Sequence, residues 1–304
     1  LIHWAKKDNR NKYDDILKTN QRLLINSIIN WGASNHTAMR TLIYQQLNGF
    51  GMDEEIKYVC VKGEKVCKWY FFKNNKWNES EDGDCIRNYL SENNTIRLLF
   101  QKELDKANNQ LREYENNGET KELVEAQKKK IDKIRKFIND TLCNYNYLKV
   151  IENVCRDTFT MDNNKFFNKL DANPYLIGFN NGLYDLNEMK FRKMKGMDLV
   201  TMTTGYDYNK NAVNTPEYRE VKHFFETILP VKEVREYTLK LFASFICGIK
   251  RSELFLFLKG SGANGKSIFV DIIAKALGDY KGNLDVSKLT QKRKPADNAD
   301  PSVA

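Results

Sequence analysis

The sequence predicts an α+β N-terminal region with a helical hairpin, followed by the start of an α/β domain that contains a phosphate-binding loop. The first part rests on short segments rich in β-branched and aromatic residues, which lie between long segments with helical spacing. The second part rests on an apolar run that leads into a glycine-rich loop and a further helical segment.

We expect four parts along the chain. They are a helical linker with a small β unit at 1–95, a helical hairpin with a mixed α/β region at 96–215, a helical connector at 216–250, and the truncated phosphate-loop domain at 251–304. The chain begins with Leu1 rather than methionine, so we also expect it to be a fragment of a longer protein.

Composition limits the class of protein. Of the 304 residues, 41% are hydrophobic and 29% are charged, so a folded core is expected and a disordered chain is excluded. The net charge of +9 favours an anionic partner.

No apolar run approaches the roughly 18 residues of a membrane span, so we expect no membrane partner and a cytoplasmic location. The six cysteines and three histidines have no zinc-ligand spacing, which predicts reduced thiols and no zinc site.

The first 95 residues predict helices followed by a small sheet. Up to about Gly51, isoleucine and leucine recur at helical spacing. Ile56–Val61 and Val66–Phe72 have the composition of strands, and Asn74-Asn75 then turns the chain toward Trp77. The aromatic residues of this segment could stack on nucleic-acid bases. We favour the alternative, in which they form the core of the sheet.

Residues 96–142 predict two charged helices that fold back at Asn116-Asn117-Gly118 as a hairpin. A basic stripe in the second helix could lie on phosphates. Acidic residues lie close to it, so we favour a solvated helix face. The stripe consists of Lys128, Lys129, Lys130, Lys133, Arg135 and Lys136.

The segment from Asn144 to Tyr208 contains a predicted β-hairpin. Leu176–Phe179 and Leu183–Leu186 flank an Asn-Gly pair that tolerates the positive φ of a tight primed turn. Asp185 in this hairpin could be catalytic, although a single carboxylate beside a turn is more often structural.

Two helices follow. Thr215-Pro216 is a typical helix start, and Val221, Phe224, Phe225, Ile228 and Leu229 then form one apolar face. The second helix runs from about Val231 to Gly248 and is expected to bury five apolar side chains. These are Val234, Leu241, Phe242, Phe245 and Ile246.

The strongest motif lies near residue 260. Leu254–Leu258 has the composition of a strand buried on both faces of a parallel sheet. The motif G-x-x-x-x-G-K-[ST] follows directly as Gly260, Ser261, Gly262, Ala263, Asn264, Gly265, Lys266 and Ser267. A helix over Ile268–Leu277 completes the order, with Gly278 as its stop. Its expected buried residues are Ile268, Phe269, Ile272, Ile273 and Leu277.

This order predicts binding of ATP with Mg²⁺. Glycines let successive backbone N–H groups point at a phosphate, and the helix N-terminus adds its partial positive charge. Lys266 would reach the β- and γ-phosphates and is the candidate catalytic residue, while Ser267 would ligate Mg²⁺. The alternative is a flexible glycine turn without a ligand.

Several segments together resemble a known family. They are Lys68–Trp77, Asn173–Leu186, Phe191-Arg192, Thr203–Tyr208, the phosphate loop and the closing Pro295–Pro301. The combination resembles poxvirus-type primase–helicases, the superfamily 3 helicases of nucleocytoplasmic large DNA viruses. The similarity spans essentially the whole chain.

The resemblance implies a homohexameric AAA+ ring that translocates on single-stranded or forked DNA without sequence specificity, at a viral replication site in the host cytoplasm. It also implies a helical collar before the ATPase domain, and a primase domain upstream in the full protein. The acidic Walker B pair, the sensor residue and the arginine finger are expected after Ala304. Two alternatives stay open, namely an AAA+ origin-binding or helicase-loading ATPase and a non-enzymatic nucleic-acid-binding scaffold. Lys292-Arg293-Lys294 is a further candidate DNA contact.

We predict that residues 1–304 alone do not turn over ATP. Hydrolysis requires a carboxylate that helps to hold the metal and orient water, and an arginine worth roughly 10³–10⁵ in rate in GTPases. No apolar run that ends in paired carboxylates follows Ser267. The measurement is phosphate release from the purified chain with Lys266→Ala as the blank, and steady release that this variant abolishes would contradict the prediction.

Overall fold

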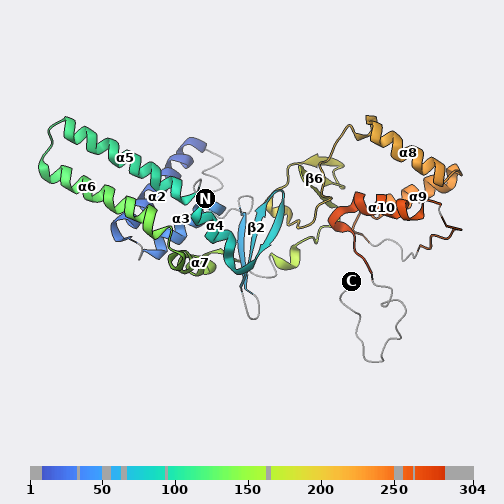
Figure 1. Ribbon diagram of the computed structural model, residues 1–304, viewed down its shortest axis with the longest axis horizontal. Helices are drawn as coiled ribbons and strands as arrows, with labels where there is room; N and C mark the ends of the chain where they lie inside the picture. Colours follow the sequence, from blue (N-terminus) through green and yellow to red (C-terminus); the bar gives the residue numbers. More distant parts are fainter. Residues whose placement is uncertain are drawn as a thin grey trace, which may run out of the picture. The chain divides into compact units, whose positions relative to one another are not determined.

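The computed structural model describes residues 9–32, 35–49, 56–62, 67–92, 95–161, 166–249, 256–262 and 264–284. The chain divides into two compact units (Figure 1). Unit 1 comprises residues 1–172 and 195–201, and unit 2 comprises residues 173–194 and 202–304. Helices predominate and two small sheets are present, so the α+β part of the predicted fold class is confirmed.

Two helices begin unit 1, α2 (Arg10–Trp31) and α3 (His36–Asn48). An asparagine side chain caps each of them, because Asn9 accepts a hydrogen bond from the Lys12 N–H and Asn35 accepts one from the Ala38 N–H. The helices meet through residues that are buried almost completely. These include Ile28, Met39, Leu42 and Ile43. The predicted helical character of this segment is confirmed for the described residues.

The larger sheet has the strand order β3-β2-β1-β4. Its strands are β1 (Tyr58–Lys62), β2 (Cys67–Lys73), β3 (Lys76–Ser80) and β4 (Thr160–Met161). The first three are antiparallel, and β4 joins β1 in parallel. Asn74 and Asn75 have φ values of 54° and 56°, as a primed two-residue turn requires. The predicted strands and turn are confirmed, and the short β4 is an addition.

Both faces of this sheet are buried. Trp69 packs on one face among the helices, in a core that also holds Phe100 and Phe159. Tyr70 and Trp77 pack on the other face in a second cluster. The Trp77 indole donates a 2.7 Å hydrogen bond to the carbonyl oxygen of Gly196. The three largest rings of the segment therefore belong to the core, as predicted, and none of them is available to stack on bases.

The predicted helical hairpin consists of α5 (Ile96–Asn116) and α6 (Lys121–Lys136), which lie side by side (Figure 1). Gln127 joins them by donating a 2.8 Å hydrogen bond to the carbonyl oxygen of Ala107. On the outer face, Lys128 pairs with Glu115 at 3.5 Å, and Lys129 is exposed. The basic stripe is thus a solvated helix face in this structure.

A π-helical turn, η4 (Phe137–Thr141), follows α6 and leads into α7 (Tyr145–Phe159). The short helix α4 (Asp84–Ser91) precedes the hairpin. Short 3₁₀ turns complete the chain; they are η3 (Glu81–Gly83), η5 (Phe167–Lys169), η6 (Gly196–Asp198), η7 (Ala212–Asn214) and η8 (Gly278–Tyr280).

A buried carboxylate joins three elements of unit 1. Glu152 on α7 is 1% exposed and accepts hydrogen bonds from the Trp69 indole of β2 at 3.1 Å, from Arg87 of α4 at 3.2 Å and from Arg156 at 2.9 Å. Each carboxylate oxygen has a charged donor, which is the condition under which an ionised group is tolerated in a core.

Gly83 lies directly against this carboxylate. Its φ of 71° is unfavourable for other residues, and a β-carbon there would lie 2.5 Å from Cδ of Glu152. Both constraints require glycine at this position.

The sheet of unit 2 has three antiparallel strands, β5 (Leu176–Phe179), β6 (Gly182–Asp185) and β7 (Lys190–Arg192). The predicted hairpin is confirmed. The predicted primed turn is wrong, because neither Asn180 nor Asn181 has a positive φ. The segment 205–208 shapes this turn instead. Asn180 donates to the carbonyl oxygen of Gly205 at 2.8 Å, and Asn181 accepts from the Tyr208 N–H at 2.9 Å.

The helices of unit 2 are α8 (Pro216–Ile228), α9 (Lys232–Ser244) and α10 (Lys266–Leu277). The predicted start of α8 is confirmed, since the Thr215 side chain accepts from the Tyr218 N–H at 3.3 Å. Of its predicted apolar face only Phe225 is buried, and Val221 is 39% exposed.

The predicted burial along α9 is wrong for three of the five residues, whereas Leu241 and Phe242 are half-buried. Val234, Phe245 and Ile246 are 50%, 44% and 46% exposed, and the helix ends at Ser244 rather than at Gly248. The physical reason is that few described residues cover this helix. Gly248 bonds elsewhere, because its N–H donates to the carbonyl oxygen of Pro174 at 3.0 Å.

All six cysteines are free. Burial raises the pKa of Cys60 and Cys155 to about 12, so these thiols stay protonated and unreactive at neutral pH. Among the residues that the structure describes, no cluster of three or more metal-ligating side chains occurs. Within the same residues, no helix has the length and apolar character needed to cross a bilayer.

We predict that Glu152→Ala lowers the free energy of unfolding of unit 1 by about 3 kcal/mol, because it leaves the buried Trp69 indole N–H without its acceptor and removes the buried carboxylate that pairs with Arg87 and Arg156. Tryptophan fluorescence in a urea titration measures this, since all four tryptophans precede residue 78. The matched control is Lys68→Ala, which breaks the exposed Lys68–Glu79 pair of the same sheet and should cost less than about 1 kcal/mol. Equal losses in the two variants would show that Glu152 does not join these elements.

Candidate functional site

The glycine-rich loop adopts a conformation that its glycines permit. Gly262 and Gly265 have φ values of 95° and 80°, which other residues rarely adopt. Gly265 is the N-cap of α10, so the loop leads directly into the helix as the motif requires. Ala263 lies outside the described residues.

The two ends of the loop lie close together. A β-carbon at Gly260 would lie 2.9 Å from Nζ of Lys266 and would overlap the side-chain amide of Asn264. The Lys266 ammonium donates a hydrogen bond to Oδ1 of Asn264. The loop therefore folds back so that the lysine charge lies over its first glycine.

The start of α10 is open to an acceptor. Within the described part of the chain, no side chain caps this helix, so its first N–H groups have no side-chain partner there. Ser267 is exposed, and its hydroxyl has no hydrogen bond to any described residue. A helix N-terminus, an ammonium group and an exposed hydroxyl within one turn can together hold a phosphate and its metal ion.

The strand predicted before the loop is not formed in the described residues. Leu256, Phe257 and Leu258 lie in no strand and are 44%, 84% and 46% exposed, and Leu254 and Phe255 lie outside the described residues. A parallel strand requires a neighbour on at least one edge, and the sheet β5–β6–β7 does not include this segment. The α/β part of the fold class thus stays a proposal.

Aromatic packing holds the middle of α10. Phe269 is buried and makes edge-to-face contacts with Phe225 of α8 and Phe242 of α9, at ring distances of 5.7 and 5.0 Å. The predicted burial of Phe269 is confirmed. Ile268 is 55% exposed, so its predicted burial is wrong. The other three expected residues, Ile272, Ile273 and Leu277, are half-buried.

The C-terminal end of α10 is bonded to the segment 202–204. Gly278 ends the helix with a φ of 56°, as predicted. Asp279 accepts from the Thr203 N–H at 3.0 Å. The Tyr280 hydroxyl accepts from the Gly178 N–H at 2.8 Å and donates to the carbonyl oxygen of Met202 at 3.0 Å. Sequence reasoning missed Asp279 and Tyr280, because no local pattern connects them to partners more than 70 positions earlier.

Another candidate, Asp185, is hydrogen-bonded away from the loop. Oδ1 of Asp185 accepts from the N–H groups of Asn187 and Glu188 at 3.0 and 3.2 Å, so this carboxylate is committed to the turn before β7. Its expected structural role is confirmed. The basic triplet Lys292-Arg293-Lys294 and the segment Pro295–Pro301 lie outside the described residues.

A family comparison identifies the region before the loop. The model of the family "D5 N terminal like" matches residues 52–230, which run from the larger sheet through α8. The chain belongs to the D5 N-terminal-like family. The match includes most of the segments on which the resemblance to viral primase–helicases rests, and it ends before the glycine-rich loop.

Individual relatives match more of the chain than the family model does. A protein of Acanthamoeba polyphaga mimivirus, named "putative helicase", is 30% identical over the whole chain and 30% of its own length. A "putative primase" of African swine fever virus is 22% identical over 98% of the chain and 31% of its own length. A protein of Frog virus 3, also described as a "putative helicase", is 22% identical over 82% of the chain and 34% of its own length. The chain thus spans about a third of the length of these relatives.

We predict that Tyr280→Phe loosens the attachment of α10 to the smaller sheet. The Gly178 N–H would lose its acceptor, at a cost of about 1–3 kcal/mol, and should exchange its hydrogen roughly tenfold faster or more. Hydrogen exchange of a peptide that covers β5 and β6 measures this. Tyr218→Phe on the exposed face of α8 is the control, and unchanged exchange in Tyr280→Phe would contradict the attachment.

Proposed function

We propose that this chain is part of an ATP-dependent DNA helicase of viral DNA replication, of the superfamily 3 primase–helicase type. One observation carries the proposal: the loop Gly260–Ser267 places the Lys266 ammonium at the open N-terminus of α10. The family membership and the names of the relatives support it, since they point to viral helicases and primases.

The loop residues would bind Mg²⁺–ATP in defined roles. The N–H groups at the start of α10 would donate to the β-phosphate, and Lys266 would neutralise the β- and γ-phosphates. Asn264 holds the Lys266 ammonium over Gly260, so the charge is already directed toward the loop. The exposed Ser267 hydroxyl, which has no hydrogen bond to a described residue, would ligate the metal ion. The bound metal would supply charge neutralisation between the phosphates.

Hydrolysis and unwinding belong to the full-length protein in this proposal. A homohexameric ring would bring an arginine from the neighbouring subunit to each ATP, and the ring would move along single-stranded or forked DNA. The site of action would be the place of viral DNA replication in the cytoplasm.

We predict that Lys266→Ala weakens Mg²⁺–ATP binding by about 1.5–3 kcal/mol, which corresponds to roughly a 10- to 150-fold higher Kd. The reason is the loss of the main positive charge on the phosphates. Isothermal titration calorimetry on residues 1–304 measures the change.

Lys275→Ala is the matched control, because it removes an exposed charge from the last turn of the same helix. Its affinity should equal that of the unmodified chain. Equal affinity of the Lys266→Ala variant would remove the loop assignment, and absence of ATP binding by the unmodified chain would favour a non-enzymatic scaffold.

A further inference from the structure

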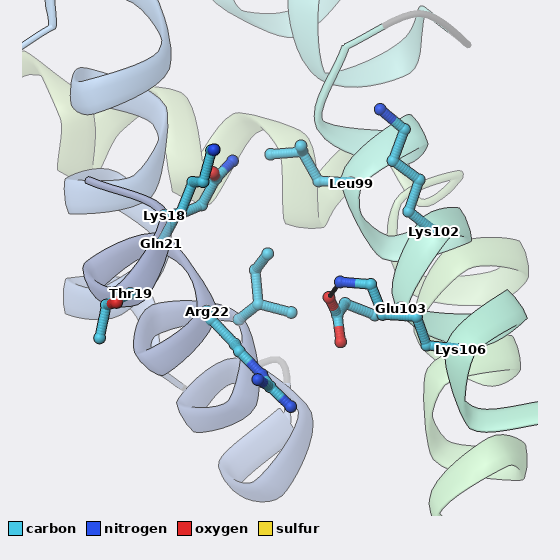
Figure 2. Close-up of a pocket in the computed structure, with 9 residues that line it drawn as sticks. Lys18, Thr19, Gln21, Arg22, Leu99, Lys102, Glu103 and Lys106 are labelled. Carbon is cyan, nitrogen blue, oxygen red and sulfur yellow. Dashed lines mark hydrogen bonds and ion pairs between the residues drawn. The ribbon is translucent and has the colours of Figure 1, made fainter. Parts of the chain in front are cut away.

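Unit 1 contains a basic groove that is separate from the glycine-rich loop. We propose that this groove, between α2 and α5, binds the phosphodiester backbone of single-stranded nucleic acid. The groove encloses about 400 Å³ and has an apolar floor at Ile25 and Leu99. Positively charged side chains from both helices line it (Figure 2).

The cations form two rows that face each other. Lys18 and Arg22 are one helical turn apart on α2, and Lys102 and Lys106 are one turn apart on α5. Four residues of helix advance by about 6 Å, so each wall presents two charges at that interval. All four side chains are exposed, which leaves them accessible to a ligand.

The groove carries an excess of positive charge. Among the described residues that line the groove, Glu103 is the single carboxylate and pairs with Lys106 at 2.5 Å. Four cations and one anion of these residues give a net charge of +3. Lys18 lies 4.0 Å from Asp15, but both side chains are at least three-quarters exposed and the pair is weak. Arg22 and Lys102 have no carboxylate within 4.0 Å among the described residues.

This arrangement favours a polyanion. Like charges on facing walls repel each other and lower the free energy of unfolding unless an anion lies between them. A backbone with several linked phosphates neutralises both rows at once and releases its counterions, whereas one free phosphate reaches only part of the set. Ile25 and Leu99 on the floor provide apolar surface for the sugars of the same strand.

The shape favours a single strand over a duplex. The two backbones of a duplex are separated by a groove about 12 Å wide in B-DNA, so they need cations spread over a wide face. Here the charges line the two sides of one groove of about 400 Å³, so one backbone that lies along it can contact both rows. The choice of nucleic acid as the polyanion rests on the proposed function, while the groove itself does not depend on the loop.

The test measures binding of a fluorescent 20-nucleotide oligothymidylate to residues 1–304 by anisotropy, over a range of salt concentrations. The variant Arg22→Gln/Lys102→Gln removes the two unpaired cations. With a slope of about 0.7 per phosphate for single strands, it should reduce the salt slope by about 1.4 and the affinity about 25-fold at 0.1 M salt. Circular dichroism verifies the fold of each variant.

Lys129→Gln/Lys133→Gln is the matched control, because it removes two exposed lysines one turn apart on α6. Its binding should stay within twofold of the unmodified chain. Equal losses in both double variants, or none in the groove variant, would overturn the proposal. Tighter binding of a 20-base-pair duplex than of the oligothymidylate would also overturn it. The same holds if tripolyphosphate or polyglutamate, at matched charge, competes with the labelled strand as well as unlabelled oligothymidylate does.

The Lys266→Ala variant separates this proposal from the proposed function. It should bind the oligonucleotide as the unmodified chain does. If Lys266→Ala loses ATP binding but still binds the oligonucleotide, the two sites are independent. If the unmodified chain binds ATP and the groove variant binds the oligonucleotide unchanged, the groove proposal fails and the proposed function stands.

Discussion

The buried Glu152 carboxylate is the interaction on which unit 1 depends. It receives donors from β2, from α4 and from its own helix, so the sheet and two helices share one charged centre. A carboxylate in a core is tolerated only where its oxygens are bonded, and this fixes the mutual position of the elements that carry the donors. Gly83 lies against the same carboxylate, and a β-carbon at this position would clash with it.

Local chemistry made most of unit 1 predictable. The Asn74-Asn75 turn, the aromatic strands and the helical hairpin each depend on residues within a few positions of one another. The Glu152 centre could not be predicted in this way, because Trp69 and Arg87 lie 83 and 65 positions from their acceptor. The basic groove could not be predicted either. The one-turn spacing of its cations is visible in the sequence, but the packing of α2 beside α5 is not. These cations are Lys18, Arg22, Lys102 and Lys106.

Unit 2 shows where apolar patterning is insufficient. The pattern of α9 correctly predicted a helix and failed to predict its exposure, since burial depends on what covers a face. The Leu256–Leu258 run failed for a related reason, because a strand is defined by its neighbours and not by its own composition. The loop itself was more predictable, since Gly262 and Gly265 adopt φ values of 95° and 80°, which glycine permits and other residues rarely adopt.

The two ends of helix α10 carry different groups of residues. Its first turn carries Lys266 and Ser267, and its last turn leads into Asp279 and Tyr280, which hold the segment 202–204 and β5. Twelve residues of helix are about 18 Å long and stiff along the axis. Because a helix is stiff along its axis, a displacement of the loop along that axis would also displace the residues that bond to β5 and to the segment 202–204.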